Sequence, residues 1–279
     1  MESIVLDQLT TLGHPQRMAV FRLLMRRFPD AVPAGEIAGA LDQKASTMSV
    51  YLSALTRARL ISQERVGTSL RYRIDMAAVQ GLTDGLLLDC CRGRPELCPP
   101  ELLPASPKEP LMSDRMFNVL FICTGNSARS IFAESILRAE GGGRFNVYSA
   151  GTRPTSALNP FAVEMLKSKG HDVSGLRSKN VGEFQGEDAP ELDFVFTVCD
   201  RAANEECPSW PGQPVTGHWG VPDPVKAEGT SAERRLAFQQ AYGMLRNRIV
   251  GFAALPLGTL DRVAQQAAVD ALAEEEPVN

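Results

Sequence analysis

The chain has 279 residues, of which 44% are hydrophobic and 22% are charged, and its formal net charge is −4. This length suits about two globular domains, and the small negative charge excludes nucleic-acid binding over the whole surface. No apolar run approaches the ~20 residues of a membrane span, and the N-terminus lacks a signal-peptide pattern. We therefore expect a cytoplasmic protein that does not contact a membrane.

The first 91 residues are predicted to be mainly helical, with one hairpin. Apolar residues recur at helical spacing in four segments, 8–28, 34–41, 46–58 and 76–91. Two extended runs, 61–66 and 70–74, flank Gly67-Thr68 and predict the hairpin. Helix, turn, helix and hairpin in this order predict an α+β winged helix-turn-helix domain.

A proline-rich stretch separates this part from the rest. Residues 92–115 contain six prolines and few large apolar side chains, a composition that favours an extended linker over a helix. We therefore expect a domain over 1–91, a linker over 92–115, a second domain over 116–255 and a tail over 256–279. The tail has a helical pattern over 260–272, to which we assign no function.

Strands and helices are predicted to alternate after the linker. Apolar runs predict strands over 117–122, 145–149, 193–198 and 214–219. Helical patterns cover 131–140, 160–170 and 231–252, and Asn159-Pro160 is a typical helix start. This alternation predicts an α/β doubly wound parallel sheet, whose ligands bind at the carboxyl ends of the strands.

The octapeptide over 123–130, Cys-Thr-Gly-Asn-Ser-Ala-Arg-Ser, directly follows the first of these strands. A thiol at the start of a helix is expected to have a lowered pKa, because backbone N–H groups favour the thiolate. The same N–H groups, with the Arg129 guanidinium, would hold a tetrahedral oxyanion, phosphate or arsenate, against Cys123. The residues of this oxyanion-binding loop are Thr124, Gly125, Asn126, Ser127, Ala128, Arg129 and Ser130. The alternative is an ordinary buried cysteine with an arginine nearby.

Further motifs in this domain complete a family pattern. They are Tyr148-Ser149-Ala150-Gly151, Asn159-Pro160, Thr197-Val198-Cys199-Asp200, Cys207-Pro208 and His218-Trp219-Gly220-Val221-Pro222-Asp223-Pro224. With the octapeptide, they resemble the ArsC family, arsenate reductases built on the low-molecular-weight tyrosine phosphatase fold, over residues 117 to about 255. The resemblance implies that Cys123 is the nucleophile, Arg129 the main oxyanion ligand and Asp223 the general acid. The alternative for Asp223 is a turn cap, and we interpret His218 as structural.

Arsenate reduction needs two electrons, which thiols supply. Cys199 would attack the sulfur of Cys123, releasing arsenite and leaving a disulfide. Cys207 would then attack Cys199 and present the disulfide to a reductant such as thioredoxin, without any tightly bound cofactor. A phosphatase would need only Cys123, so the two extra cysteines favour a reductase. The alternative for Cys199 is filling of the core, where free cysteines are common.

Several positions depart from the family pattern. Thioredoxin-coupled members commonly carry a further cysteine where Ala128 stands, and the stretch between Cys199 and Cys207 is one residue longer than in well-known members. Some members bind potassium through an acidic residue in the loop that here reads Arg177-Ser178-Lys179. Because this loop carries a lysine, we expect no bound cation there. The main rival is a low-molecular-weight protein tyrosine phosphatase with a regulatory DNA-binding domain, in which tyrosine would usually stand at Val225. A second rival is a binding protein whose loop senses anions without catalysis.

The N-terminal domain carries Leu12-Gly13-His14-Pro15-Gln16-Arg17, Leu60-Ile61-Ser62 and a basic run over 65–73. With the helices over 34–58, these resemble the ArsR family of arsenic-responsive winged-helix repressors, which implies a homodimer bound to operator DNA. Residues 57–73 hold five arginines against one glutamate, which suits phosphate contacts. The candidate DNA-binding residues are Lys44, Ser46, Thr47, Ser49, Arg57, Arg65, Arg71 and Arg73. The alternative is a solvated charged face of a protein-interaction domain.

Arg59 stands where the repressor family usually has glycine. A non-glycine residue that ends a helix in the left-handed conformation is strained by about 1 kcal/mol, so we expect this helix to end in a different shape.

Three cysteines, Cys90, Cys91 and Cys98, lie at and just after the end of the last predicted helix of this domain. Three thiolates match the preference of As(III), a soft ion with trigonal-pyramidal geometry. The alternatives are zinc or another soft metal, and incidental thiols. The whole sequence is thus interpreted as an arsenate reductase fused to an arsenite-responsive transcriptional repressor, with arsenite as both product and effector in arsenic detoxification.

Overall fold

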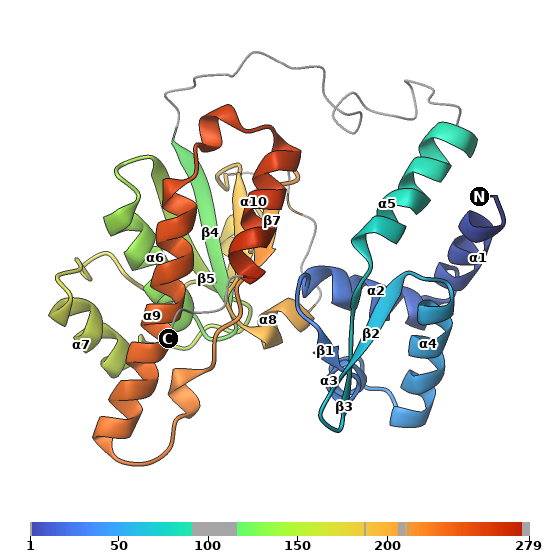
Figure 1. Cartoon of the computed structure of the whole chain (residues 1–279). Coiled ribbons are helices and arrows are strands. Elements are labelled where there is room, and N and C mark those ends of the chain that lie inside the picture. The colour runs from blue at the N-terminus through green and yellow to red at the C-terminus, as the bar shows by residue number, and fades with distance from the viewer. Residues whose placement is uncertain (1, 91–115, 187, 206–209, 211, 275–279) are drawn as a thin grey trace. The chain divides into compact units, whose positions relative to one another are not determined.

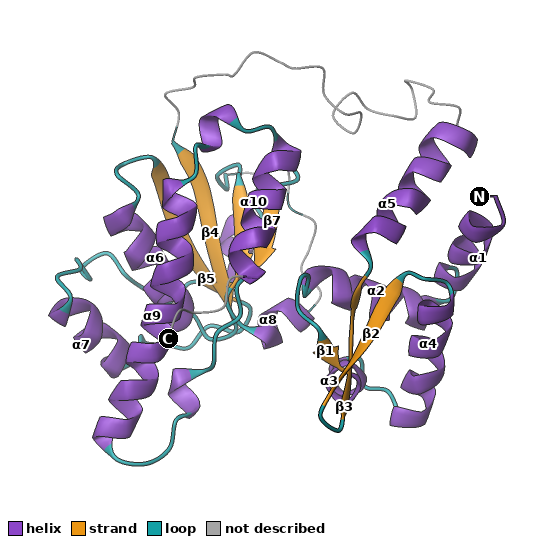
Figure 2. Cartoon of the chain, in the orientation of Figure 1, coloured by secondary structure: helices purple, strands orange, loops and turns teal. Residues whose placement is uncertain are grey.

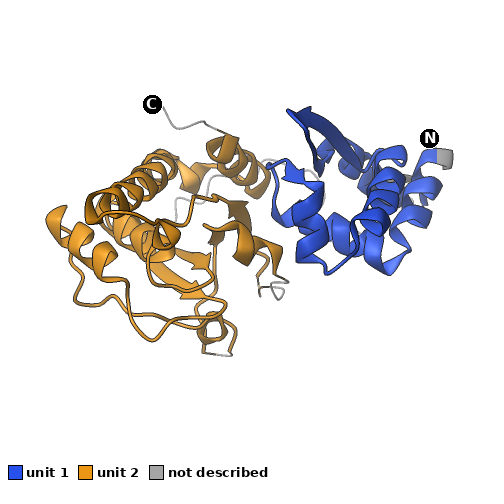
Figure 3. Ribbon diagram, turned by 90° about the horizontal axis from the view of Figure 1, so that it is seen from below, with its two compact units in different colours: residues 1–111 blue, residues 112–279 orange. Residues whose placement is uncertain are grey.

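The computed structural model describes residues 2–90, 116–186, 188–205, 210 and 212–274. They fall into two compact units, one within residues 1–111 and the other within 112–279 (Figure 3). Figures 1 and 2 show a first unit of helices with a small sheet and a second unit in which helices surround a larger sheet. Within these described ranges, no helix has both the length and the apolar character needed to cross a bilayer.

The first unit is built from short helices and a three-stranded antiparallel sheet of order β1-β3-β2. Its elements are α1 (Glu2–Leu12), α2 (Pro15–Arg26), β1 (Val32–Pro33), α3 (Ala34–Ala40), α4 (Ala45–Arg57), β2 (Ile61–Val66), β3 (Ser69–Ile74), α5 (Met76–Asp84) and the π-helical η1 (Gly85–Cys90). Its core includes Leu23, Ile37, Met48 and Leu52, all fully buried. The helical segments expected from the sequence are present, although the first is divided where His14 caps α2.

The hairpin predicted at Gly67-Thr68 is confirmed. Strands β2 and β3 pair continuously from Ile61 with Ile74 to Val66 with Ser69, which leaves a two-residue turn. Gly67 has a φ of +61°, a conformation that glycine adopts without steric cost.

The expectation for the end of α4 is wrong. Arg59 has a φ of +59°, so it adopts the left-handed conformation in spite of its side chain. The amide of Leu60 donates to the carbonyl of Leu55 at 3.1 Å, and the amide of Arg59 donates to the carbonyl of Thr56 at 3.0 Å. These are the two hydrogen bonds of a Schellman motif. Leu60 is fully buried directly after this turn, and its burial offsets the strain at Arg59, which costs about 1 kcal/mol.

The second unit has the predicted parallel α/β sheet. Its four strands are all parallel, in the order β5-β4-β6-β7, and α6 packs on β4, β5 and α9. Its elements are β4 (Phe117–Cys123), α6 (Arg129–Glu140), β5 (Phe145–Gly151), α7 (Pro160–Ser168), η2 (Val181–Phe184), β6 (Phe194–Thr197), α8 (Asp200–Asn204), β7 (Val215–His218), η3 (Pro224–Lys226), α9 (Ser231–Ala254), η4 (Leu257–Thr259) and α10 (Arg262–Glu274).

Aromatic side chains fix the centre of this sheet. The rings of Phe196 and Trp219 stack with their centroids 3.9 Å apart, and Phe252 of α9 meets Phe196 edge-on at 5.2 Å. Such pairs stabilise beyond the area that they bury. They pack β6, α9 and Trp219 together directly after His218, the last residue of β7.

The last helix, α10, belongs to the second unit and packs on β7. The side-chain amide of Gln266 accepts from the backbone N–H of Thr216 at 3.3 Å and donates to its carbonyl at 2.7 Å. Gly217 makes room for this packing, because a Cβ there would lie 2.7 Å from Val269. The pattern over 260–272 therefore has a structural role.

Candidate active site

Cys123 lies at the carboxyl end of β4, which is one of the two inner strands of the sheet. Helix α6 begins at Arg129, with Ala128 as its N-cap residue, so residues 123–129 form the predicted strand-to-helix turn. Cys123 is buried, with 3% of its surface exposed.

A neighbouring segment holds this loop by its carbonyl groups. Four amides of residues 152–159 donate to loop carbonyls at 2.9–3.1 Å: Thr152 to Cys123, Arg153 to Thr124, Thr155 to Gly125 and Asn159 to Ser127. Because the C=O and N–H of a trans peptide point in opposite directions, the N–H groups of the loop face away from this segment. One of them, that of Asn126, donates to Cys123 Sγ at 3.1 Å. The loop therefore presents N–H groups on the side of the sulfur, as an oxyanion cradle requires.

Asn126 is the centre of a buried network beneath the loop. Its backbone φ is +44° and its side chain is fully buried. Its Nδ2 donates to Ser130 Oγ at 2.9 Å and to Ser149 Oγ at 2.8 Å, while its Oδ1 accepts from the backbone N–H of Lys179 at 2.7 Å. Ser130 Oγ lies 2.9 Å from Cys123 Sγ. The network fixes the loop and directs a hydroxyl at the sulfur.

Glu134 places a buried negative charge next to this network. Its carboxylate accepts from Ser149 Oγ and pairs with Lys179 Nζ at 3.1 Å and with Arg138 Nη2 at 2.5 Å. Lys179 belongs to the loop in which some family members bind potassium. Its ammonium also donates to the carbonyl of Arg177 at 3.1 Å. Sequence reasoning did not assign Glu134 to the site. The available signal was a carboxylate inside the wholly buried stretch 130–137 of α6.

Arg129 and Asp223 form an ion pair beside the loop. Arg129 Nη2 lies 2.9 Å from Asp223 Oδ2, and Arg129 Nη1 donates to the carbonyl of Val221 at 3.3 Å. Asp223 also accepts from the N–H of Val225 at 3.2 Å at the start of η3, so the turn cap weighed as an alternative is present together with the ion pair. The structure thus gathers Cys123, Arg129 and Asp223 at one place.

The pKa of Cys123 differs from the sequence-based expectation. Burial raises the pKa of this thiol above its ordinary value, and the nearby charge of Cys199 raises it further. Hydrogen bonds with Ser130 and the charge of Arg129 lower the pKa, but they do not outweigh burial. The expected lowering is therefore wrong, because burial dominates over the groups that favour the thiolate.

Cys199 lies at the start of α8, next to the loop. It is buried with 1% exposed, and its Sγ accepts from the N–H of Ala202 at 3.4 Å as an N-cap. The same Sγ lies 3.5 Å from Thr124 Oγ1. The structure therefore brings the second candidate thiol to the oxyanion loop. Cys207 lies outside the described residues.

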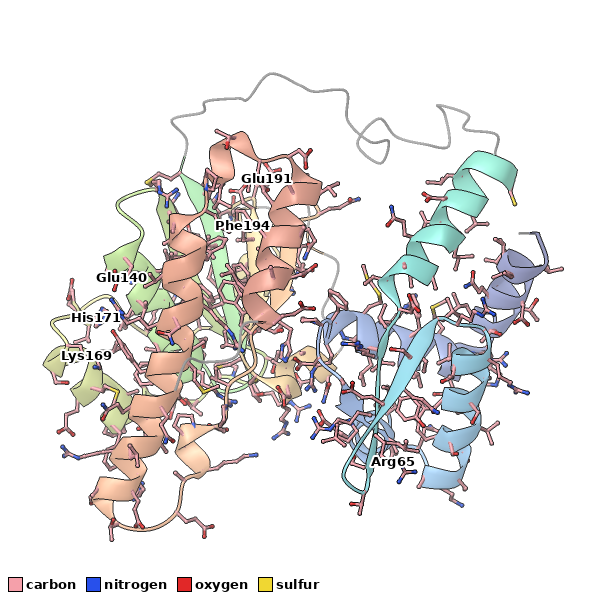
Figure 4. All side chains as sticks on the ribbon, viewed as in Figure 1. Arg65, Glu140, Lys169, His171, Glu191 and Phe194 are labelled. Carbon is pink, nitrogen blue, oxygen red and sulfur yellow. The ribbon has the colours of Figure 1, made fainter. Side chains whose placement is uncertain are left out.

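The candidate DNA-binding residues of the first unit lie on α4 and on the hairpin. Lys44, Ser46, Thr47, Ser49 and Arg57 belong to or cap α4, and Arg65, Arg71 and Arg73 belong to β2 and β3. All of them are exposed except Thr47 and Arg71, which are partly buried. Figure 4 shows Arg65 on the hairpin, close to its turn.

Of the three candidate As(III) ligands, one is placed. Cys90 is the last residue of η1, and its thiol is exposed and free. Cys91 and Cys98 lie outside the described residues.

The second unit matches a known protein family. Residues 118–266 fit the family model of low molecular weight phosphotyrosine protein phosphatases. This match spans more than half of the chain, so the chain belongs to that family and is an enzyme.

Individual relatives of the second unit are reductases. The chain is 39% identical over 139 residues to an arsenate reductase of Bacillus licheniformis, which covers 48% of this chain and 94% of the relative. It is 37% identical over 135 residues to an arsenate reductase of Bacillus subtilis, with the same two coverages. A solved structure, an arsenate reductase in an oxidized state, shows 28% identity and a TM-score of 0.41, and covers 50% of this chain and 98% of its own.

Proposed function

We propose that the second unit reduces arsenate to arsenite through a thiol–disulfide relay, with no tightly bound cofactor. The observation that carries the proposal is the position of Cys199, buried and 3.5 Å from Thr124 Oγ1 of the oxyanion loop. A phosphate-ester hydrolase needs one nucleophilic thiol, whereas a reductase needs a second thiol within reach of the first. The similarity to two arsenate reductases over almost their whole length supports this proposal.

In the first step, arsenate binds between the loop N–H groups and the Arg129 guanidinium. The Cys123 thiolate attacks arsenic, so that a sulfur–arsenic bond forms and an arsenic–oxygen bond breaks. Asp223, in its protonated form, gives its proton to the departing oxygen, which leaves as water. The contact between Arg129 and Asp223 holds the proposed acid beside the anion ligand.

In the second step, the Cys199 thiolate attacks Cys123 Sγ. A disulfide forms, the sulfur–arsenic bond breaks, and its electron pair stays on arsenic, which leaves as arsenite. Cys207 then attacks Cys199, so that Cys123 is released as a thiolate and the disulfide joins Cys199 to Cys207. A dithiol protein such as thioredoxin reduces this disulfide and becomes oxidised itself.

One assay separates this function from its rivals. The wild type, Cys123→Ser and Cys199→Ser are incubated with arsenate, thioredoxin, thioredoxin reductase and NADPH, and the same proteins are tested on para-nitrophenyl phosphate. We expect NADPH oxidation by the wild type alone, with ester hydrolysis retained in Cys199→Ser. Ester hydrolysis by the wild type without any arsenate reduction would instead identify a tyrosine phosphatase. The absence of both activities in the wild type would identify an anion-binding protein.

We also propose that the first unit is a winged helix-turn-helix domain of a repressor. It would span residues 1–91 and join the reductase, residues 116–255, through the linker over 92–115. The tail over 256–279 follows the reductase, and its helix α10 packs on β7 of that unit. The order of α3, α4 and the β2–β3 hairpin supports this assignment. Exposed Ser46 and Ser49 at the start of α4 suit base edges, and exposed Arg65 and Arg73 on the hairpin suit phosphates.

The repressor is proposed to act as a homodimer. Helix α1 leaves Ile4, Leu6 and Leu9 exposed, with 48%, 65% and 38% of their surfaces accessible. A second copy of this unit would bury these apolar side chains, and a two-fold dimer suits an operator with two half-sites. Sedimentation of wild type and Leu6→Asp tests this, with the wild type expected as a dimer and the variant as a monomer.

Arsenite is proposed to be the effector, bound by Cys90, Cys91 and Cys98. The free, exposed thiol of Cys90 supports this role, and such thiols stay reduced in the cytoplasm, where we place the protein. The test is fluorescence anisotropy of DNA from upstream of the gene. We expect arsenite to release the wild type from this DNA and to leave Cys90→Ser bound. Unchanged affinity of the wild type would refute the proposal.

A further inference from the structure

His218 bonds to residues on both sides of Cys199. Its ring is buried, with 2% of the residue exposed, at the end of β7. Its Nδ1 lies 2.8 Å from the hydroxyl of Thr197, two residues before Cys199, and its Nε2 lies 3.2 Å from Asp200 Oδ1, one residue after it. One imidazole therefore ties both flanks of the second thiol to the neighbouring strand.

The chemistry of the partners gives this contact a direction. An ionised carboxylate only accepts hydrogen bonds, so Nε2 carries a hydrogen and donates it to Asp200. In the neutral ring, Nδ1 is then an acceptor, and the Thr197 hydroxyl donates to it. The hydroxyl and the backbone of Thr197 are therefore both held by β7. The hydroxyl bonds the His218 ring, and the backbone pairs with His218 in the parallel register of β6 and β7.

Gly220 is needed for this arrangement. A Cβ at this position would lie 2.6 Å from Asp200 Oδ1 and 2.8 Å from His218 Nε2. Any larger residue would force the carboxylate and the imidazole apart. The chain therefore keeps an open space at the place where the two groups meet.

Helix α8 depends on contacts of this kind. It has five residues, Asp200–Asn204, too few for a helix to be stable by itself. Cys199 is its N-cap residue, so the position of Cys199 Sγ beside Thr124 follows the position of this first turn. The side chain of Asp200, bonded to His218, links that turn to β7.

We propose that His218 is a positioning residue for the attack of Cys199 on Cys123. Through Thr197 and Asp200 it holds Cys199 Sγ at the oxyanion loop, beside Thr124. It takes no part in the attack of Cys123 on the oxyanion, which uses the loop, Arg129 and Asp223. This inference rests on the proposed reductase function and adds a requirement specific to its second step.

The test uses variants of the full chain that break the contact between Asp200 and His218 without removing the buried imidazole of His218. Asp200→Ala removes the acceptor from a side chain that is 54% exposed, and Gly220→Ala pushes the pair apart. Asp200→Asn keeps an oxygen acceptor for Nε2 and is the conservative rescue. Asp188→Ala, at an exposed aspartate before β6, is the matched control.

Three rates are measured for each protein: arsenate reduction, hydrolysis of para-nitrophenyl phosphate, and alkylation of Cys199 by iodoacetamide in a Cys123→Ser background. Tryptic peptide 180–201 reports the alkylation, since Cys199 is its only cysteine. We expect Asp200→Ala and Gly220→Ala to reduce arsenate about tenfold or more slowly, with ester hydrolysis within about twofold of the wild type. Cys199 should be alkylated several-fold faster, and Asp200→Asn and Asp188→Ala should resemble the wild type.

The result that overturns the inference is an equal loss of both activities, or arsenate reduction and alkylation at wild-type rates, in Asp200→Ala and Gly220→Ala. Failure of the proposed function itself has another signature, the absence of arsenate reduction in the wild type. The alkylation rates still test the placement of Cys199 by His218 in that case.

Discussion

The ammonium of Lys179 lies 3.1 Å from the carboxylate of Glu134, and both side chains are buried. Glu134 also accepts from Ser149, which accepts from Asn126, and Asn126 bonds Ser130 beside the sulfur of Cys123. A buried charge pair is thus connected to the oxyanion loop by a continuous series of hydrogen bonds.

Removing this ammonium should destabilise the second unit. Lys179→Met leaves Glu134 buried with only the partly exposed Arg138 as its ion-pair partner, and we expect a loss of about 3 kcal/mol in the free energy of unfolding. Urea unfolding followed by tryptophan fluorescence measures it, because Trp210 and Trp219 both belong to the second unit. Arg177→Met is the control, since its ion pair with Glu183 is largely exposed and should contribute under about 1 kcal/mol. Equal midpoints for the two variants would contradict this prediction.

The reactivity of Cys123 should respond to pH as a raised pKa requires. Only the thiolate reacts with iodoacetamide, so the alkylation rate rises with pH through the pKa of Cys123. Because burial raises this pKa, the midpoint should lie above that of an ordinary cysteine. Cys199→Ser removes a charge that raises the pKa, so the midpoint should move to lower pH in that variant. Labelling of tryptic peptide 116–129 gives both profiles, and an upward shift in Cys199→Ser would show that the cause is misassigned.

Asp223 should matter most for poor leaving groups. Asp223→Asn keeps an oxygen that can accept from the N–H of Val225, so the turn remains while the proton donor is lost. Phenolate needs protonation to leave and para-nitrophenolate does not, so hydrolysis of phenyl phosphate should fall about 10²-fold and that of para-nitrophenyl phosphate much less. Steady-state rates on the two esters provide the comparison. Equal losses on both would assign Asp223 a purely structural role.

Arginines of the hairpin should contribute to DNA binding through phosphates. Arg65→Ala and Arg73→Ala should each weaken binding to all DNA sequences and reduce the slope of log affinity against log salt by about 0.9. Anisotropy titrations at several salt concentrations give this slope. Arg22→Ala, at an exposed arginine of α2 outside the candidate set, should leave it unchanged. Identical slopes for all three variants would exclude the hairpin from the interface.

Local patterns were sufficient to predict most of the fold. The strand before Cys123, the helix start at Asn159-Pro160 and the Gly67-Thr68 turn each depend on neighbouring residues, and the structure has all three. The prediction for Arg59 was wrong because the burial of Leu60, which favours the left-handed turn, depends on distant parts of the chain.

The surroundings of Cys123 could not be predicted in the same way. Glu134 and Lys179 are 45 positions apart and meet only after β4, α6 and β5 have packed. The pKa of Cys123 depends on its burial and on Cys199, neither of which the octapeptide contains. His218 was assigned a structural role because the mechanism expected from the sequence gives it no step, and its contact with Asp200 is visible only in the folded chain.

The contact between Gln266 and Thr216 covers backbone groups at which copies of this protein could otherwise associate edge to edge. Strand β7 is one of the two edge strands of the sheet. The amide of Val215 bonds on the β6 side, so the polar backbone groups of Thr216 face outward. An uncovered strand edge recruits strands from other molecules and starts aggregation. The amide of Gln266 occupies both hydrogen-bonding groups of Thr216. Helix α10 therefore blocks the addition of a further strand at Thr216 on the β7 edge of the sheet.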